Sequence, residues 1–136
     1  MKHSAIKAAK SIWNSFPLII GTVLLVSLFS TIIPKNFILL VFKNNFILDP
    51  LIGGFFGSVF AGNPLVSYIF AGELLKQGIS LIAITAFIVS WVTVGIIQIP
   101  AEAAILGKKF TLMINITAFV FAIIVATITI LILNII

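Results

Sequence analysis

Two uncharged amide side chains stand beside prolines within long apolar stretches of this sequence. Asn63 directly precedes Pro64, and Gln98 lies two residues before Pro100. A proline inside a helix removes a backbone hydrogen bond, and in lipid each unpaired backbone group is costly. Such an interruption persists only where it is buried in protein or lines a polar cavity, so both positions are candidate solute-binding sites. The open alternative is that the two amides bond only the freed backbone.

Ser67 and Tyr68 follow Pro64 by about one helical turn, which predicts that both line the same cavity. We further expect the interruption at residues 62–64 to approach the one at residues 98–100 near the middle of the bilayer. Facing one cavity lets water or solute serve both sets of freed backbone groups. The N–H groups at the start of each following helix suit an anionic or polar solute.

Glu102 follows the second proline and is a candidate relay group, because a carboxylate within a membrane usually marks a transport pathway. Glu73 lies near the end of the helix expected after the first proline. The ordinary alternative for both acids is a position at the lipid headgroups, where they would pair with Lys76 and Lys108. Asp49, the third acid, directly precedes a proline and is predicted to cap a helix N-terminus.

No catalytic or metal-binding constellation is visible in the sequence. The single histidine, His3, lies in the basic N-terminal segment, whereas a metal site needs several convergent ligands. The chain contains no cysteine and no glycine-rich phosphate loop, and its hydroxyl residues have no histidine base beside them. We therefore expect neither an enzyme nor a bound cofactor.

The composition is typical of a membrane protein. Of the 136 residues, 62% are hydrophobic and 8% are charged, whereas soluble domains carry about a quarter charged residues. The absence of strand-like alternation predicts an all-α polytopic membrane protein with about four main transmembrane segments. The net charge of +5 comes from lysine without any arginine, which argues against nucleic-acid binding and suits anionic lipid headgroups.

Two regions are expected along the chain. Residues 1–15 place apolar and basic side chains on opposite helical faces and predict an amphipathic helix on the membrane surface, the alternative being a disordered basic leader. Residues 16–136 predict a single transmembrane domain with spans near 16–33, 79–99 and 110–136. If residues 48–77 cross once, four lysines lie on each side of the membrane and predict no orientation. If this segment is re-entrant, five lysines lie on one side and three on the other.

The remaining segment, residues 48–77, is interrupted at 62–64. As one straight helix it would be about 45 Å long, too long for a hydrocarbon core of roughly 30 Å, and it is too short for two full spans. It is therefore either a kinked, tilted span or, as we favour, a re-entrant hairpin of two half-helices. Gly78 is expected to end the second half-helix.

Small residues recur at every fourth position in two of the expected helices. The stripes consist of Gly53, Gly57 and Ala61 in the first and Ala118, Ala122 and Ala126 in the second. Such stripes let helix backbones approach closely, either between two subunits or within one.

The order of motifs along the chain resembles a known family. An apolar span leads to IPKNFILLVF and LIGGFFGSVFAGNP, ELLKQG ends the next helix, and a further span leads to QIPAEAAILGKKF. From residue 16 onward this pattern resembles one half of the predicted permeases of the YraQ type, which include the arsenical permeases. The nucleoside-recognition gate membrane proteins show a similar pattern of glycine and proline interruptions.

The resemblance implies a transporter with two homologous halves and with sites at both proline interruptions, which correspond here to Asn63, Pro64 and Pro100. Family members usually carry both halves in one chain, whereas this chain matches one half. The arsenical permeases use a cysteine near the first interruption, and this chain has none. An arsenical substrate is therefore not implied.

We therefore expect a permease subunit of the cell membrane that moves a small polar or anionic solute. The residues expected around its cavity are Asn63, Pro64, Ser67, Tyr68, Gln98, Pro100 and Glu102. A half-length chain needs a second half, which predicts a homodimer in parallel or antiparallel arrangement. The alternative is a membrane anchor or assembly subunit that transports nothing, which needs no amide–proline pair within its spans.

Overall fold

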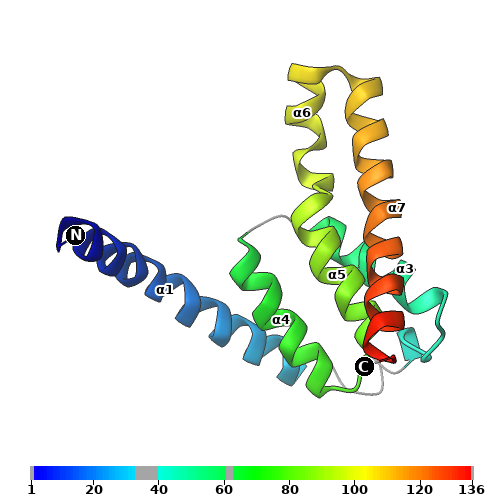
Figure 1. Cartoon of the computed structure of the whole chain (residues 1–136), viewed down its shortest axis with the longest axis horizontal. Helices are drawn as coiled ribbons and strands as arrows, with labels where there is room; N and C mark the ends of the chain where they lie inside the picture. The colour runs from blue at the N-terminus through cyan, green and yellow to red at the C-terminus, as the bar shows by residue number, and fades with distance from the viewer. Residues whose placement is uncertain (1, 33–39, 61–62, 136) are drawn as a thin grey trace.

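The computed structural model describes residues 2–32, 40–60 and 63–135, and the regular elements in these ranges are all helical (Figure 1). The prediction of an all-α chain is confirmed for this part of the protein. The elements are α1 (Lys2–Ile32), α3 (Leu48–Val59), α4 (Pro64–Lys76), α5 (Leu81–Thr93), the short 3-10 helix η1 (Ile96–Gln98), α6 (Ile99–Leu106) and α7 (Lys108–Leu133).

Three helical stretches in the described ranges are long and apolar enough to cross a membrane, namely Lys10–Leu28, Leu81–Leu106 and Lys108–Leu133. They correspond to three of the four expected membrane segments. The fourth, residues 48–77, is divided into α3 of 12 residues and α4 of 13 residues. At about 1.5 Å per residue each is roughly 20 Å long or less, shorter than a hydrocarbon core of roughly 30 Å.

Helix α1 is continuous from Lys2 to Ile32, with Pro17 inside it. The helix therefore does not break where a surface helix at residues 1–15 was expected to meet a span beginning at residue 16. A single proline removes one hydrogen bond, and no glycine or polar turn accompanies it to end the helix here. In Figure 1, α1 extends away from the other helices and packs along α4.

Helices α3 and α5 lie in close backbone contact. A Cβ atom added to Gly53 would overlap the carbonyl oxygen of Ala83, and one added to Gly57 would overlap that of Phe87. These two contacts step in the same direction along both helices, so α3 and α5 run parallel. The glycines of the first small-residue stripe therefore serve packing within one chain, and Ala61, the third member, lies outside the described residues.

The second small-residue stripe faces α5 from α7. Ala122 and Ala126 are completely buried, and Ala126 packs with Ile82 and Ala86 of α5. Ala118 is only half-buried. Figure 1 shows α7 running antiparallel beside the long rod formed by α5, η1 and α6.

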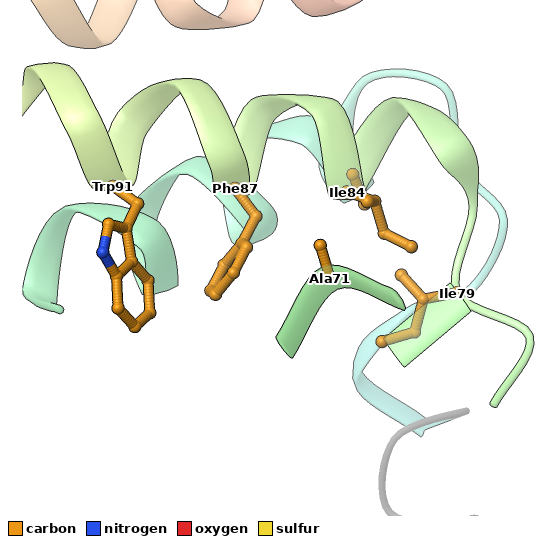
Figure 2. Close-up of a cluster of buried hydrophobic side chains, with 6 residues drawn as sticks. Ala71, Ile79, Ile84, Phe87 and Trp91 are labelled. Carbon is orange, nitrogen blue, oxygen red and sulfur yellow. The ribbon is translucent and has the colours of Figure 1, made fainter. Parts of the chain in front are cut away.

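Helix α4 covers another side of α5 through an apolar cluster that Figure 2 shows in close-up. Ala71 of α4 packs there against Ile84 and Phe87 of α5. The ring of Trp91 closes one end of this cluster, with Phe60 stacked on it at a centroid distance of 5.3 Å. Because Phe60 directly follows α3, this stack fixes the end of α3 beside the last turn of α5.

Gly78 ends helix α4, as expected from the sequence. Its φ of +93° is in the left-handed region, which glycine adopts without strain. The N–H of Ile79 donates to the carbonyl of Leu74 at 3.2 Å, and the N–H of Gly78 donates to that of Leu75 at 3.0 Å. This pair of bonds is the Schellman arrangement, and the contact between Ile79 and Leu74 in the apolar cluster accompanies it.

The predicted capping role of Asp49 is wrong. Asp49 lies inside the first turn of α3, and the Asn45 side chain instead accepts the N–H of Ile47 at 3.0 Å. The carboxylate of Asp49 is buried and accepts a hydrogen bond from the Ser80 hydroxyl at 2.8 Å. Because the Asn45 side chain accepts a backbone N–H before α3 begins, the Asp49 side chain is available to bond Ser80 at the start of α5.

Candidate functional site

The second interruption lies at residues 94–98, between α5 and α6, and not at Pro100 itself. Helix α5 ends at Thr93, and η1 then leads directly into α6. Pro100 falls in the first turn of α6, where the missing N–H would have had no helical partner. The start of the interruption, Val94, lies at the middle of the membrane-length stretch Leu81–Leu106.

Asn115 of α7 bridges this interruption. Its side-chain oxygen accepts the N–H of Gly95 at 3.2 Å, and its Nδ2 donates to Glu102 Oε2 at 3.1 Å. The same Nδ2 donates to the carbonyl of Thr111 at 3.0 Å. Only 6% of Asn115 is exposed. We call the set Gly95, Glu102 and Asn115 the amide bridge.

Gln98 lies over the same interruption. A Cβ atom on Gly95 would come within 2.9 Å of Gln98 Oε1, so the Gln98 side chain is folded against the amide bridge. Gln98 occupies the N-cap position of α6 without a capping bond from its side chain, and it is exposed. The structure thus brings together three of the predicted residues here, Gln98, Pro100 and Glu102.

Sequence reasoning did not identify Gly95 or Asn115. Asn115 is the only carboxamide within α7, whose other residues after the two N-terminal lysines are uncharged and mostly apolar. A lone amide in such a helix signals a buried partner, because an unsatisfied amide in hydrocarbon is costly. Gly95 could have been found as the one glycine within the span before Pro100.

At the first interruption, Asn63 satisfies backbone N–H groups at the start of α4. The side-chain oxygen of Asn63 accepts the N–H of Leu65 at 3.0 Å, and its carbonyl accepts the N–H of Val66 at 3.0 Å. Pro64 occupies the first helical position, and the buried Ser67 hydroxyl donates to its carbonyl at 2.7 Å. Asn63 therefore acts as a helix cap, and Gly62 lies outside the described residues.

Tyr68 lies apart from the other predicted site residues. It is exposed and lines a cavity of about 510 Å³ between α1 and α4, together with Thr31, Glu73 and Lys76. Glu73 and Lys76 form an ion pair at 3.5 Å, with the lysine side chain 78% exposed. This pairing is the ordinary alternative considered for Glu73.

The flanks of the two interruptions lie at the same level of the fold. Phe60, at the end of α3, stacks on Trp91, and α3 also contacts η1. Asn63 and Gln98 form no hydrogen bond with each other in the described part of the chain. The ends of α3 and α5 thus lie side by side. A cavity shared by the two interruptions remains a prediction.

The comparisons with known proteins leave the chain without an assigned family. No family model, curated protein or solved structure matches it. Within the described residues, no group of three or more histidine, cysteine or acidic side chains is placed to hold a metal ion.

Proposed function

We propose that this chain is a permease subunit that moves a small polar or anionic solute past the two helix interruptions. The proposal rests on one observation, the amide bridge, which joins Gly95 at the middle of a membrane-length stretch to Glu102, four residues before the end of that stretch. Polar and ionisable groups inside a membrane are costly and usually belong to a solute or ion pathway. An anchor that only holds the chain in lipid needs no such bridge between an interrupted helix and its neighbour.

The lengths of α3 and α4 support a re-entrant hairpin within that permease. Helix α3 runs parallel to α5, and α4 runs in the opposite direction in Figure 1. Two helices of 12 and 13 residues would enter the membrane and return to the same side. Half-helices that meet in this way are a recurrent arrangement around solute sites in transporters.

The residues named from the sequence contribute unequally to the proposed pathway. Gln98 and Glu102 lie at the amide bridge, and Asn63 caps α4 at the other interruption. The Asn63 oxygen accepts the N–H of Leu65, whereas its side-chain NH₂ has no hydrogen bond to the described residues and would be the group that meets a solute. Ser67 would support the backbone near Pro64, and Tyr68 would line the separate cavity beside α1.

A second copy would complete the pathway in the cell membrane. This part of the proposal comes from the resemblance to one half of the YraQ-type permeases. Because Gly53 and Gly57 pack against α5 of the same chain, the dimer would use other exposed apolar faces. Cross-linking in membranes, with a tag at each chain end, would report both the dimer and the orientation of its subunits.

Uptake into proteoliposomes tests the permease against the anchor. We would measure entry of radiolabelled phosphate, glycine and urea, and expect at least one to enter faster than into protein-free vesicles. Asn63→Leu and Gln98→Leu should abolish that difference, whereas Asn134→Leu, at the exposed end of α7, should retain it. Equal entry of all three solutes with and without the protein would favour the membrane anchor.

A further inference from the structure

The cavity of about 510 Å³ between α1 and α4 is polar at one end and apolar at the other. The two helices run in the same direction in Figure 1, so Thr31 near the end of α1 and Lys76 at the end of α4 lie at the same end of the cavity. Glu73 lies one turn before Lys76, whereas Val23 and Ile69 line the part further back along the two helices. An occupant must therefore be polar at one end and apolar along the rest.

The polar end of this cavity lies at the level expected for lipid headgroups. The membrane-length stretch of α1, Lys10–Leu28, ends three residues before Thr31. Helix α4 has 13 residues and is about 20 Å long at 1.5 Å per residue. That length matches one leaflet of a bilayer that is about 40–45 Å thick with its headgroups. A phospholipid of this leaflet would place its headgroup beside Lys76 and its acyl chains along Val23 and Ile69.

The two charged side chains at the polar end carry opposite signs and hold each other weakly. Glu73 Oε2 and Lys76 Nζ are 3.5 Å apart, whereas a strong charge-assisted hydrogen bond measures about 2.7–2.9 Å. The Glu73 side chain is 30% exposed and that of Lys76 is 78% exposed, so water screens the pair. Lys76 can therefore turn to an anionic group of a ligand, and Glu73 to a cationic one.

We propose that this cavity binds one phospholipid whose headgroup is zwitterionic and carries a primary amine. Its phosphate would accept a hydrogen bond from Lys76, and its ammonium group would donate to Glu73. A headgroup with a net negative charge and no amine offers nothing to Glu73, and a quaternary ammonium has no N–H to donate. Basic pockets between membrane helices are known to bind lipid headgroups, and the acid beside Lys76 narrows the choice here. The site does not depend on the proposed transport of a solute.

Two glycines allow this cavity and a neighbouring one to be filled separately. Gly72 lines the proposed lipid cavity, and a Cβ atom added there would meet nothing within 4 Å. Gly21 has equally open space and lines a separate cavity of about 340 Å³ between the same helices, where no charged side chain contributes to the lining. Gly72→Leu would therefore fill the lipid cavity, whereas Gly21→Leu would fill only its neighbour.

Native mass spectrometry of the purified chain in detergent would count the bound lipids directly. We would add dioleoyl lipids that differ only in their headgroup, namely phosphatidylethanolamine, phosphatidylcholine and phosphatidylglycerol. The expected result is a single saturable adduct with phosphatidylethanolamine, at an apparent Kd at least tenfold lower than that of the other two lipids. Because the acyl chains are identical, this preference reports the headgroup contacts alone.

Matched variants locate the lipid. Gly72→Leu should remove the adduct, whereas Gly21→Leu should retain it. Lys76→Gln should weaken binding at least tenfold, whereas Lys109→Gln, in the exposed start of α7, should leave the Kd unchanged. Glu73→Lys should reverse the headgroup preference in favour of phosphatidylglycerol. Circular dichroism would show which variants fold, and the two variants of the exposed ion pair decide the matter if Gly72→Leu does not fold.

Four results would overturn the phospholipid site. Equal affinity for the three lipids would indicate adsorption to apolar surface only, and tighter binding of phosphatidylglycerol by the parent chain would indicate attraction to lysine alone. An unchanged affinity in folded Gly72→Leu would place the lipid elsewhere, and an unchanged preference in Glu73→Lys would remove the acid from the site. Phosphatidylethanolamine binding without any solute uptake would retain the site and remove only the permease.

Discussion

The Asn115 amide donates to the Glu102 carboxylate at 3.1 Å, and this bond joins α7 to α6 across an interruption of the neighbouring rod. The same side chain accepts the N–H of Gly95, which has left the helical pattern of α5. One amide therefore satisfies a freed backbone donor and a carboxylate together. This arrangement explains how a chain with so few polar residues tolerates an interruption at this depth.

Replacing Asn115 by leucine should destabilise the fold. The change leaves the Gly95 N–H and the Glu102 carboxylate without their partner. An unsatisfied group costs about 1–3 kcal/mol when fully buried, and these two residues are half-buried, so the cost of each should lie at or below that range. We expect a lower midpoint of thermal unfolding in detergent for Asn115→Leu than for Asn134→Leu, which changes an exposed residue. Equal midpoints would show that the bridge contributes nothing to stability.

The contact between α3 and α5 predicts opposite outcomes for two glycine substitutions. Gly53→Ala places a methyl group against the Ala83 carbonyl, and such overpacking costs about 1–3 kcal/mol. Gly72→Ala lies in α4 with open space around it, so alanine should be neutral or stabilise the helix by about 0.5–1 kcal/mol. The unfolding midpoints of both variants check this, and a harmless Gly53→Ala would mean that α3 does not pack as described.

The Asp49–Ser80 hydrogen bond should show strong coupling between two residues that are 31 positions apart. The carboxylate is completely buried, so Ser80→Ala removes its described donor without admitting water. A double-mutant cycle with Asp49→Ala should give a coupling energy of about 1.5–3 kcal/mol, typical of hydrogen bonds to charged groups.

The exposed Glu73–Lys76 pair provides the comparison for that cycle. Its coupling energy should stay below about 0.5 kcal/mol, because water screens an exposed pair within a helix. A coupling energy for Asp49 and Ser80 no larger than this value would contradict the described contact.

Features set by local chemistry could be predicted from the sequence. High apolar content predicted membrane-length helices, and three such stretches are present in the described ranges. Gly78 ends α4 because only a residue that tolerates positive φ forms this turn readily. The turn at Gly107 divides α6 from α7, and its φ of +89° has the same explanation.

Features that depend on distant partners could not be predicted. The partner of Asp49 is contributed by the start of α5, so the residue type alone favoured a local cap. The interruption at Gly95 requires an acceptor from α7, whereas sequence reasoning placed the break at the nearest proline. Pro17 remains inside α1, which shows that proline alone does not end a helix.

The final prediction concerns access of water to the two interruptions. The chain has no cysteine, so single cysteines can be introduced without altering the background. If the interruptions line a polar cavity, Asn63→Cys and Gln98→Cys should react with a membrane-impermeant maleimide in vesicles. Lys109→Cys, in the exposed start of α7, should react at the rate of a surface thiol.

Val120→Cys is the matched control for depth, because it is exposed on the surface of α7 near the middle of that helix, where lipid would cover it. A thiolate forms readily in water and hardly at all in hydrocarbon, so a lipid-facing cysteine reacts slowly. We expect Asn63→Cys and Gln98→Cys to react at least tenfold faster than Val120→Cys. If both react as slowly as that control while Lys109→Cys is labelled, the interruptions face lipid, and the chain is better described as an anchor than as a permease.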